Sequence, residues 1–348
     1  ELLPLIEALS EISKVLKKGN QVMLRSTVPV GVTREIVIPY LEDNTELIAG
    51  EDFYVSFSPE RTVEGGAMFE LKTLPQVVGG YSSKCTKMSS EFWSTLTPTV
   101  VRVDSLEAAE MVKLANNTFR DLSFAFANEL ALLADQFNVN AFDLIYAAND
   151  GYPRNPIPLP SPGVGGYCLT KDPILFSSTS NGLRESAVLG LASRKVNEKA
   201  ALYPIDLMYR FALRNKIKIH KLKVLMIGVA FKGIPETKDI RESVAIDILQ
   251  LLRSRVLKVY GWDAVLNSKS IEELGFLPVD NNLKDTIEEV DVILILNNHP
   301  DNALSALLVE SYKPKLIFDG WNQFDQREVE KINGLCYATM GYITHSSI

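Results

Sequence analysis

A long stretch without helix breakers constrains the fold of this chain more than any other feature. Residues 105–137 include no proline or glycine, and their apolar residues recur at helical spacing. The predicted helix is longer than most globular helices. Further helices are predicted over 141–148 and 183–214, separated by a loop rich in proline and glycine over 151–166. Because long apolar helix faces need a partner, we expect a helical domain over 105–215 that forms a homodimer.

Short apolar runs alternate with helical patterns on both sides of this domain. Strands are predicted at 21–26, 53–57, 76–78, 99–103, 223–230, 257–263, 291–296 and 315–319. Strands that alternate with helices predict parallel sheets with crossover connections. The expected fold is therefore α/β, with two sheet-containing domains, over 1–104 and 216–348, around the helical one. The second sheet is expected to be doubly wound.

Composition excludes several functional classes. The chain has 348 residues and a net charge of −7, which argues against general binding to nucleic acid or to anionic membranes. No apolar run approaches the ~18 residues of a membrane span. The cysteines and histidines, three of each, are scattered without the spacing of zinc ligands, so no metal is expected. So few cysteines are typical of a reducing compartment, and we expect a cytoplasmic protein.

The strongest local signal is a glycine-rich loop followed by Cys168, in the run Pro-Gly-Val-Gly-Gly-Tyr-Cys-Leu-Thr-Lys-Asp-Pro over 162–173. Glycines let the backbone approach a ligand closely. At the beginning of a helix, free N–H groups lower the pKa of a thiol, and Lys171 adds a positive charge. Asp172 would share the helix face of Cys168. This grouping favours covalent chemistry on a carbonyl carbon; the structural alternative is a buried, inert cysteine.

A second signal is a polar pair on the long predicted helix. Lys113 and Asn117 are four residues apart and share a face with the apolar Leu106 and Ala109. Polar groups on an apolar face need partners, so this pair predicts a polar site. A lysine held there could stabilise an alkoxide or an oxyanion. The alternative is that Lys113 faces solvent and Asn117 caps a neighbouring segment.

Three further motifs directly follow predicted strands. Glu60 and Glu64 place two carboxylates in a loop where parallel sheets bind ligands, and either could act as a general base. Thr27 could hydrogen-bond a ligand or a water. Lys232 and Arg241 flank a strand-to-helix turn that is typical of a phosphate site. Their structural alternatives are a solvated acidic turn, a simple turn and a surface charge cluster.

Five blocks, taken in order, resemble those of the UDP-glucose/GDP-mannose dehydrogenase family. They are Ser-Thr-Val-Pro-Val-Gly (26–31), Ser-Pro-Glu-Arg (58–61), Glu-Met-Val-Lys-Leu-Ala-Asn-Asn (110–117), Gly-Val-Gly-Gly-Tyr-Cys-Leu-Thr-Lys-Asp-Pro (163–173), and Gly-Val-Ala-Phe-Lys (228–232) with Arg-Glu-Ser (241–243). The resemblance implies a Rossmann-like NAD domain, a central helical dimerisation domain and a Rossmann-like UDP-sugar domain.

The resemblance also implies a four-electron oxidation of a UDP-sugar C6 alcohol by two NAD⁺. Cys168 would capture the aldehyde as a thiohemiacetal, which becomes a thioester and is hydrolysed to the uronic acid. Lys113 would stabilise the alkoxide and oxyanion, with Asn117 as its companion. Asp172 would position the catalytic water, Glu60 would act as the base in hydrolysis, and Thr27 would order water and contact NAD. The other implied NAD contacts are Glu64, Lys171 and Arg241. The implied substrate contacts are Gly165, Lys232, Glu60, Lys113 and Asn117.

The blocks favour one branch of substrates. The runs over 58–61 and 162–166 are more similar to the UDP-N-acetylhexosamine branch, whereas 167–172 is more similar to the UDP-glucose branch. We therefore expect UDP-N-acetylmannosamine or UDP-N-acetylglucosamine, with UDP-glucose as the alternative.

The beginning of the chain carries a separate expectation. The sequence opens Glu-Leu-Leu-Pro and contains no GxGxxG, so we expect residues 1–104 to be only the end of the NAD domain, without its phosphate loop. A fragment of that kind could act only as a dimeric UDP-sugar-binding module. Another alternative is a β-hydroxyacid or 6-phosphogluconate-type dehydrogenase, which uses a Lys-x-x-x-Asn pair without the cysteine.

Overall fold

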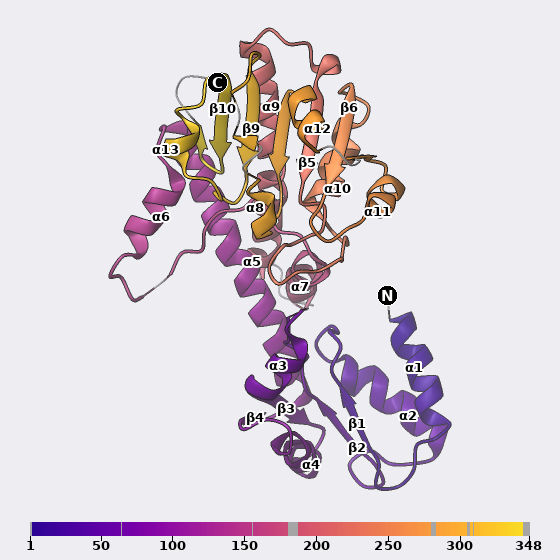
Figure 1. The fold of residues 1–348 in the computed structure, drawn as a ribbon. Coiled ribbons are helices and arrows are strands. Elements are labelled where there is room, and N and C mark those ends of the chain that lie inside the picture. The colour runs from indigo at the N-terminus through magenta and orange to yellow at the C-terminus, as the bar shows by residue number, and fades with distance from the viewer. Residues whose placement is uncertain are drawn as a thin grey trace. The chain divides into compact units, whose positions relative to one another are not determined.

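The computed structural model describes residues 2–63, 65–154, 156–179, 187–279, 283–304, 307–308 and 310–343. The chain divides into two compact units, Glu1–Phe119 with Asp172–Val188 and Arg120–Lys171 with Leu189–Ile348. Each unit is described below by itself, with the labels of Figure 1. The predicted α/β class is confirmed, because each unit contains a sheet with helices packed on it.

The first unit is built on a four-stranded sheet. Its elements are α1 (Leu3–Ser13), β1 (Gln21–Leu24), a π-helical turn (Thr33–Val37), α2 (Ile38–Thr45), β2 (Tyr54–Phe57), α3 (Ala67–Thr73), β3 (Gln76–Gly80), α4 (Ser83–Ser94) and β4 (Val100–Val103). The strand order is β1-β2-β3-β4. Its core joins the sheet to α1, α2 and the beginning of the long helix α5 (Leu106–Gln136), through residues such as Leu9, Leu41 and Leu106.

The prediction of a purely parallel sheet is wrong at one pair in this unit. β1 and β2 are parallel, as are β3 and β4, but β2 and β3 run antiparallel. A parallel pair needs a crossover that packs on the sheet, usually a helix. The connection from β2 to β3 holds only α3, which buries none of its residues. The chain therefore returns directly instead of crossing over.

The long helix is confirmed as α5 (Leu106–Gln136), and α6 (Ala141–Asn149) follows it. The Oγ of Ser105 accepts a hydrogen bond from the N–H of Ala108, which satisfies a free donor at the beginning of α5. The single run predicted over 183–214 is instead two helices, α8 (Val188–Ala200) and α9 (Tyr203–Arg214). Pro204 in the first turn of α9 explains the break, because proline has no N–H to donate to the carbonyl four residues earlier and is tolerated only where a helix begins. Residues 183–186 of that prediction lie outside the described residues.

The second unit contains a seven-stranded sheet in the order β11-β10-β9-β8-β5-β6-β7. All its pairs are parallel except β10 with β11. The elements are β5 (Lys223–Ile227), α10 (Val244–Leu252), β6 (Lys258–Trp262), α11 (Ser268–Glu273), β7 (Leu277–Pro278), α12 (Leu283–Glu289), β8 (Val292–Ile295), β9 (Lys315–Asp319), α13 (Gln326–Val329), β10 (Leu335–Thr339) and β11 (Tyr342–Ile343). The chain leaves β5 toward β6 and later returns to its other side at β8, as in a doubly wound sheet.

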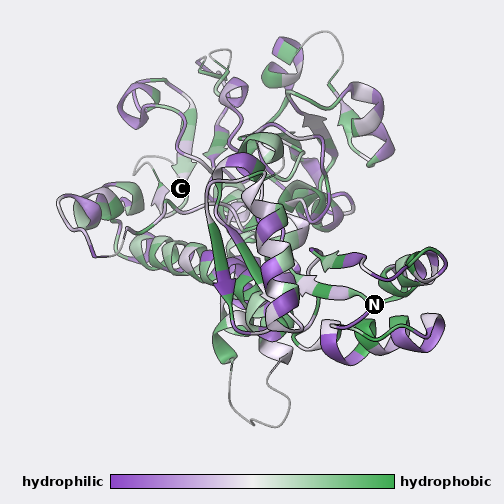
Figure 2. Cartoon of the chain, turned by 90° about the horizontal axis from the view of Figure 1, so that it is seen from below, coloured by the Kyte–Doolittle hydropathy of each residue, from purple (hydrophilic) through white to green (hydrophobic). Residues whose placement is uncertain are grey.

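Both faces of this sheet are buried. Along β5, Val224 and Met226 belong to one core with α9 and α10, whereas Leu225 and Ile227 belong to a second core with α12 and α13. Near-continuous apolar strands of this kind are expected when helices cover both faces. Figure 2 shows hydrophobic and hydrophilic residues side by side along the helices, as expected for helices with one buried side.

Candidate active site

Cys168 lies in the first turn of α7 (Tyr167–Ser178), so the prediction of a cysteine at the beginning of a helix is confirmed. Its side chain is exposed, whereas Cys85 and Cys336 are buried, and none of the three forms a disulfide. The alternative of a buried, inert Cys168 is therefore wrong. An exposed thiol beside the free N–H groups of a helix terminus is well placed to act as a nucleophile.

The glycines before Cys168 are required by close backbone contacts within the second unit. A Cβ on Gly165 would lie 2.2 Å from the carbonyl oxygen of Glu242. Gly166 has a φ of +87°, and its Cβ would lie 2.8 Å from the ring of Phe231. The N–H of Gly166 also donates to the carbonyl of Glu242 at 3.3 Å. Side chains at these positions would push the loop away from the segment that follows β5.

We expect Gly165→Ala to lower the free energy of unfolding by about 1–3 kcal/mol, because its new methyl group overlaps a backbone atom that cannot move alone. Chemical denaturation measures the change. Gly66→Ala is the matched control, because its Cβ meets only a Val63 side-chain atom at 3.3 Å and a carbonyl at 3.9 Å. Equal stability of the two variants would contradict this account of the loop.

Asp172 and Asn117 are brought together within the first unit. Asp172 is fully buried, and the Nδ2 of Asn117 donates to its Oδ2 at 2.6 Å. Asn117 and Lys113, one turn earlier on α5, are both half-buried. The alternative of a solvent-facing lysine beside a capping asparagine is therefore wrong. On α7, Asp172 follows Cys168 by one turn, so the two share a helix face as predicted.

Glu60 lies in the loop after β2 and is held by Arg25, which sequence reasoning missed. The Nη2 of Arg25 is 2.5 Å from Glu60 Oε2, and the N–H of Thr62 donates to Oε1 at 2.8 Å. Partial burial acts to raise the pKa of Glu60, but the hydrogen bonds from Thr62 and the charges of Arg25 and Lys113 together lower it below its usual value. Glu60 is therefore an ionised carboxylate close to Lys113, not a solvated acidic turn.

Thr27 is half-buried in the loop after β1. That loop is tied to α5 by Glu110, whose role sequence reasoning also missed. The carboxylate of Glu110 accepts hydrogen bonds from the N–H of Gly31 at 2.6 Å and from the N–H and hydroxyl of Thr33 at 3.0 and 2.5 Å. Burial raises the pKa of Glu110 above its usual value. Glu64 lies outside the described residues.

Two of the predicted cations of the second unit contact the ring of Tyr167, and the third, Lys232, contacts the ring of Phe231. The Nζ of Lys171 lies 4.6 Å from the centroid of the Tyr167 ring, and the Cζ of Arg241 lies 5.2 Å from it. Hydrogen bonds from Arg241 lower the pKa of Asp239, and the charge of Lys232 acts in the same direction. Lys171 and Arg241, which are predicted cofactor contacts, and Lys232, a predicted substrate contact, therefore lie at one end of the second unit.

This end of the second unit coincides with the switch point of its sheet, where doubly wound folds bind ligands. Beyond β5, a Cβ on Gly228 would lie 2.6 Å from the side chain of Asn297, which follows β8. Asp263, after β6, accepts hydrogen bonds from the N–H groups of Val229 and Ala230 at 2.7 and 2.9 Å. These contacts hold the segment that leads to Lys232 in one conformation.

The part of the chain that the structure describes contains neither a metal-binding cluster nor a membrane-spanning helix. It contains no group of three His, Cys, Asp or Glu residues that could hold a metal ion. None of its helices combines the length and the apolar character needed to span a membrane.

Together these residues have the chemistry of carbonyl oxidation. An exposed thiol at a helix beginning can attack a carbonyl, a half-buried lysine can stabilise an oxyanion, and a buried carboxylate can orient a water. Glu60 supplies a second ionised carboxylate, next to the lysine.

Comparison with known proteins places all three parts of the chain in one family. Three domain models match: "UDP-glucose/GDP-mannose dehydrogenase family, NAD binding domain" at residues 1–97, the "central domain" at 107–199 and the "UDP binding domain" at 225–326. The expectation that most of the NAD domain is missing is corrected by the match at 1–97. The alternative of a fragment that acts only as a dimeric UDP-sugar-binding module depended on that expectation and is no longer supported.

Two similar proteins share the same name. The UDP-N-acetyl-D-mannosamine dehydrogenase of Pyrococcus horikoshii is 32% identical over 317 residues, which cover 90% of this chain and 72% of that protein. The enzyme of the same name from Yersinia pestis is 33% identical, covering 90% and 75%. The solved structure of the P. horikoshii enzyme superposes with a TM-score of 0.84 at 30% identity, covering 98% of this chain and 77% of the other.

Proposed function

Because the chain belongs to the UDP-glucose/GDP-mannose dehydrogenase family, we propose that it oxidises the C6 alcohol of UDP-N-acetylmannosamine to the uronic acid with two NAD⁺. The observation that carries the proposal is the exposed Cys168 in the first turn of α7, followed one turn later by the buried Asp172. The names of the relatives support the acetylated sugar. UDP-N-acetylglucosamine and UDP-glucose are the alternatives.

The residues present fit the cofactor. The half-buried hydroxyl of Thr27 follows β1, at the carboxyl end of a parallel pair, where nucleotide cofactors bind in such sheets. We propose Thr27, Glu64, Lys171 and Arg241 as NAD contacts, the two cations by virtue of their positive charge. Bound NAD⁺ supplies the hydride acceptor for both oxidations.

In the proposed reaction, Lys113 stabilises the negative oxygen that develops at C6 as the alcohol becomes an aldehyde. The Cys168 thiolate then forms a C–S bond to the aldehyde carbon, and the oxygen takes up a proton. The resulting thiohemiacetal loses a hydride more readily than a free aldehyde, and with the loss of its hydroxyl proton to water it becomes a thioester. The covalent bond also retains the intermediate on the enzyme.

Hydrolysis completes the cycle. Asp172, whose Oδ2 accepts from Asn117, orients a water, and Glu60 takes a proton from it as the water attacks the thioester. The C–S bond breaks, the thiolate of Cys168 leaves, and the uronic acid forms. Gly165 and Lys232 are proposed to contact the nucleotide sugar.

We further propose a cytoplasmic homodimer of three domains, over 1–104, 105–215 and 216–348. An apolar stripe on α5 supports the dimer: Phe126, Leu133 and, just beyond the helix end, Phe137 are 55%, 49% and 74% exposed. They recur after seven and four residues, so they lie on one face. A second copy would cover that face, and sedimentation of the purified protein tests this. Three cysteines that form no disulfide support a reducing compartment.

The reaction stoichiometry tests the proposed function. With excess NAD⁺, the protein should produce two NADH for each UDP-N-acetylmannosamine consumed, with the uronic acid as sole product. The kcat/KM for this sugar should exceed that for UDP-glucose at least about tenfold, because a pocket shaped for an acetamido group leaves its polar groups unpaired with a hydroxyl. One NADH for each sugar, with release of the aldehyde, would contradict the covalent mechanism, and a preference for UDP-glucose would contradict the substrate.

A further inference from the structure

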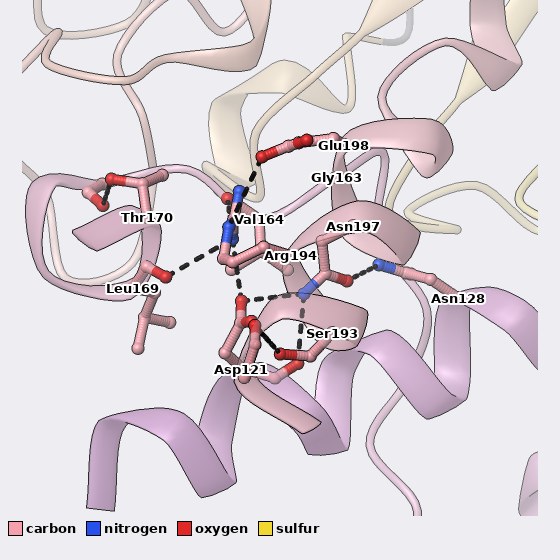
Figure 3. A network of polar contacts seen from close by, with 12 residues as sticks. Asp121, Asn128, Gly163, Val164, Leu169, Thr170, Ser193, Arg194, Asn197 and Glu198 are labelled. Carbon is pink, nitrogen blue, oxygen red and sulfur yellow. Dashed lines mark hydrogen bonds and ion pairs between the residues drawn. The ribbon is translucent and has the colours of Figure 1, made fainter. Parts of the chain in front are cut away.

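A cluster of buried polar side chains connects α5 to α8 within the second unit (Figure 3). Asp121 and Asn128 come from α5, and Ser193, Arg194 and Asn197 come from α8. We call these five residues the Asp121 cluster. Their exposed fractions lie between 0% and 6%. None of them belongs to the motifs that the sequence analysis singled out.

The centre of the cluster is a buried ion pair. Arg194 Nη1 lies 2.8 Å from Asp121 Oδ1, which also accepts from Asn197 Nδ2 at 2.8 Å. The hydroxyl of Ser193 donates to Asp121 Oδ2 at 2.6 Å. Buried ion pairs contribute little net stability, because desolvation of both charges offsets their attraction. Both oxygens of the Asp121 carboxylate accept hydrogen bonds, which points instead to a geometry that the pair maintains.

The guanidinium of Arg194 contacts the backbone on both sides of Cys168. Nη1 donates to the carbonyl of Val164 at 3.2 Å and to the carbonyl of Leu169 at 3.4 Å. Val164 lies in the glycine-rich loop, and Leu169 directly follows the cysteine in α7. One side chain therefore connects the approach to the helix with its first turn.

A second branch of the cluster holds the beginning of the same loop. The Nδ2 of Asn128 donates to Asn197 Oδ1 at 2.9 Å, and its Oδ1 accepts from the N–H of Ser161 at 2.8 Å. The hydroxyl of Ser161 in turn donates to the carbonyl of Gly163 at 2.8 Å. The loop is thus attached to the Asp121 cluster at 161 and 164, and the first turn of α7 at 169, so Cys168 lies between the last two attachments in the sequence.

We propose that Arg194, held by Asp121, is a positioning residue that fixes the backbone carrying Cys168 for attack on the aldehyde. This inference rests on the proposed function of Cys168. Arg194 acts through two carbonyl groups and need not touch the substrate. Lysine cannot replace it, because the ammonium nitrogen of lysine ends one bond short of the position of Nη1, the atom that contacts the carboxylate and both carbonyls.

The test compares Arg194→Lys with Arg210→Lys. Arg210 forms a similar pair, Nη2 to Asp135 Oδ2 at 3.0 Å, which connects α9 to α5, and its other contacts are with Asp206 and the ring of Tyr203. For Arg194→Lys, kcat should fall at least about tenfold while the KM for the UDP-sugar stays within about twofold. The NADH produced per sugar should also fall below two, because a displaced thiol captures less aldehyde. Arg210→Lys should leave all three quantities near their wild-type values.

A second measurement needs neither cofactor nor substrate. Among the three cysteines only Cys168 is exposed, so iodoacetamide should alkylate it selectively. At pH 7 the alkylation of Arg194→Lys should be at least about threefold slower than wild type, because a loosened first turn holds the sulfur less closely beside the free N–H groups at the beginning of the helix. Arg210→Lys should react at the wild-type rate.

The proposal requires both effects in Arg194→Lys. A kcat within about twofold of wild type, an equal loss in Arg210→Lys, or an alkylation rate that is unchanged or faster would each overturn it. If Arg194→Lys does not fold, Ser193→Ala, which removes one donor to Asp121, should give smaller changes in the same directions, and no change would overturn the proposal. Wild-type protein that produces one NADH per sugar would refute the proposed function itself, independently of either variant.

Discussion

Cys168→Ala should produce no uronic acid at a measurable rate, with a loss of at least about 10³-fold in the four-electron reaction. Without the thiol there is no C–S bond to retain the aldehyde or to form the thioester. The first oxidation uses other groups, so a small amount of aldehyde should still form. Mass spectrometry of the product and NADH absorbance together measure both steps.

The matched control is Cys85→Ala, because Cys85 is equally free but fully buried in α4. It should retain activity within about twofold of wild type, apart from any loss of folded protein. Full production of the uronic acid by Cys168→Ala would contradict covalent catalysis and would favour a dehydrogenase that uses only the Lys113 and Asn117 pair.

Lys113→Met should lower kcat by about 10²–10⁴-fold, because the oxygen at C6 would develop negative charge without a cation to stabilise it. Methionine retains the length and apolar stem of the side chain, so packing on α5 should change little. Lys87→Met, on the exposed surface of α4, is the control and should leave kcat unchanged. A kcat for Lys113→Met within about tenfold of wild type would contradict the proposed role.

The same variant should change the pH profile in a stated direction. The charge of Lys113 is one of the factors that lower the pKa of Glu60, so its removal should raise that pKa. Glu60 is the proposed base in thioester hydrolysis and acts only when ionised. The acid limb of the residual rate should therefore move to higher pH. Single-turnover hydrolysis of the thioester, followed from low to neutral pH, measures the change, and an acid limb at the wild-type pH would contradict a link between the two side chains.

The pairing of β2 with β3 shows how much of the fold could be predicted. The strands themselves were found near their observed bounds, because apolar runs between turn residues are local patterns. Their relative direction depends on whether the connection packs on the sheet. Because α3 buries none of its residues, it does not form a crossover packed on the sheet, and no residue pattern in 58–75 predicted this.

In the candidate site, too, local features could be predicted from the sequence, whereas contacts between distant residues could not. The sequence predicted Cys168 at a helix beginning and the Lys113 and Asn117 pair on one face, since both statements involve residues less than two turns apart. It did not predict that Arg25 holds Glu60, or that Asn117 donates to Asp172, whose positions differ by 55 in the chain. Partners so distant in sequence are chosen by packing.

The sequence by itself determined the helical span of α5, the alternation of strands and helices, the glycines before Cys168 and the family to which the motifs belong. Each of these follows from interactions between near neighbours or from the order of the blocks. Only the tertiary structure decided which side chains surround Glu60 and that Arg194, 26 residues beyond Cys168, contacts the backbone on both sides of it. Hydrogen bonds depend on distances of about 3 Å, and such distances between remote residues exist only after the chain has packed.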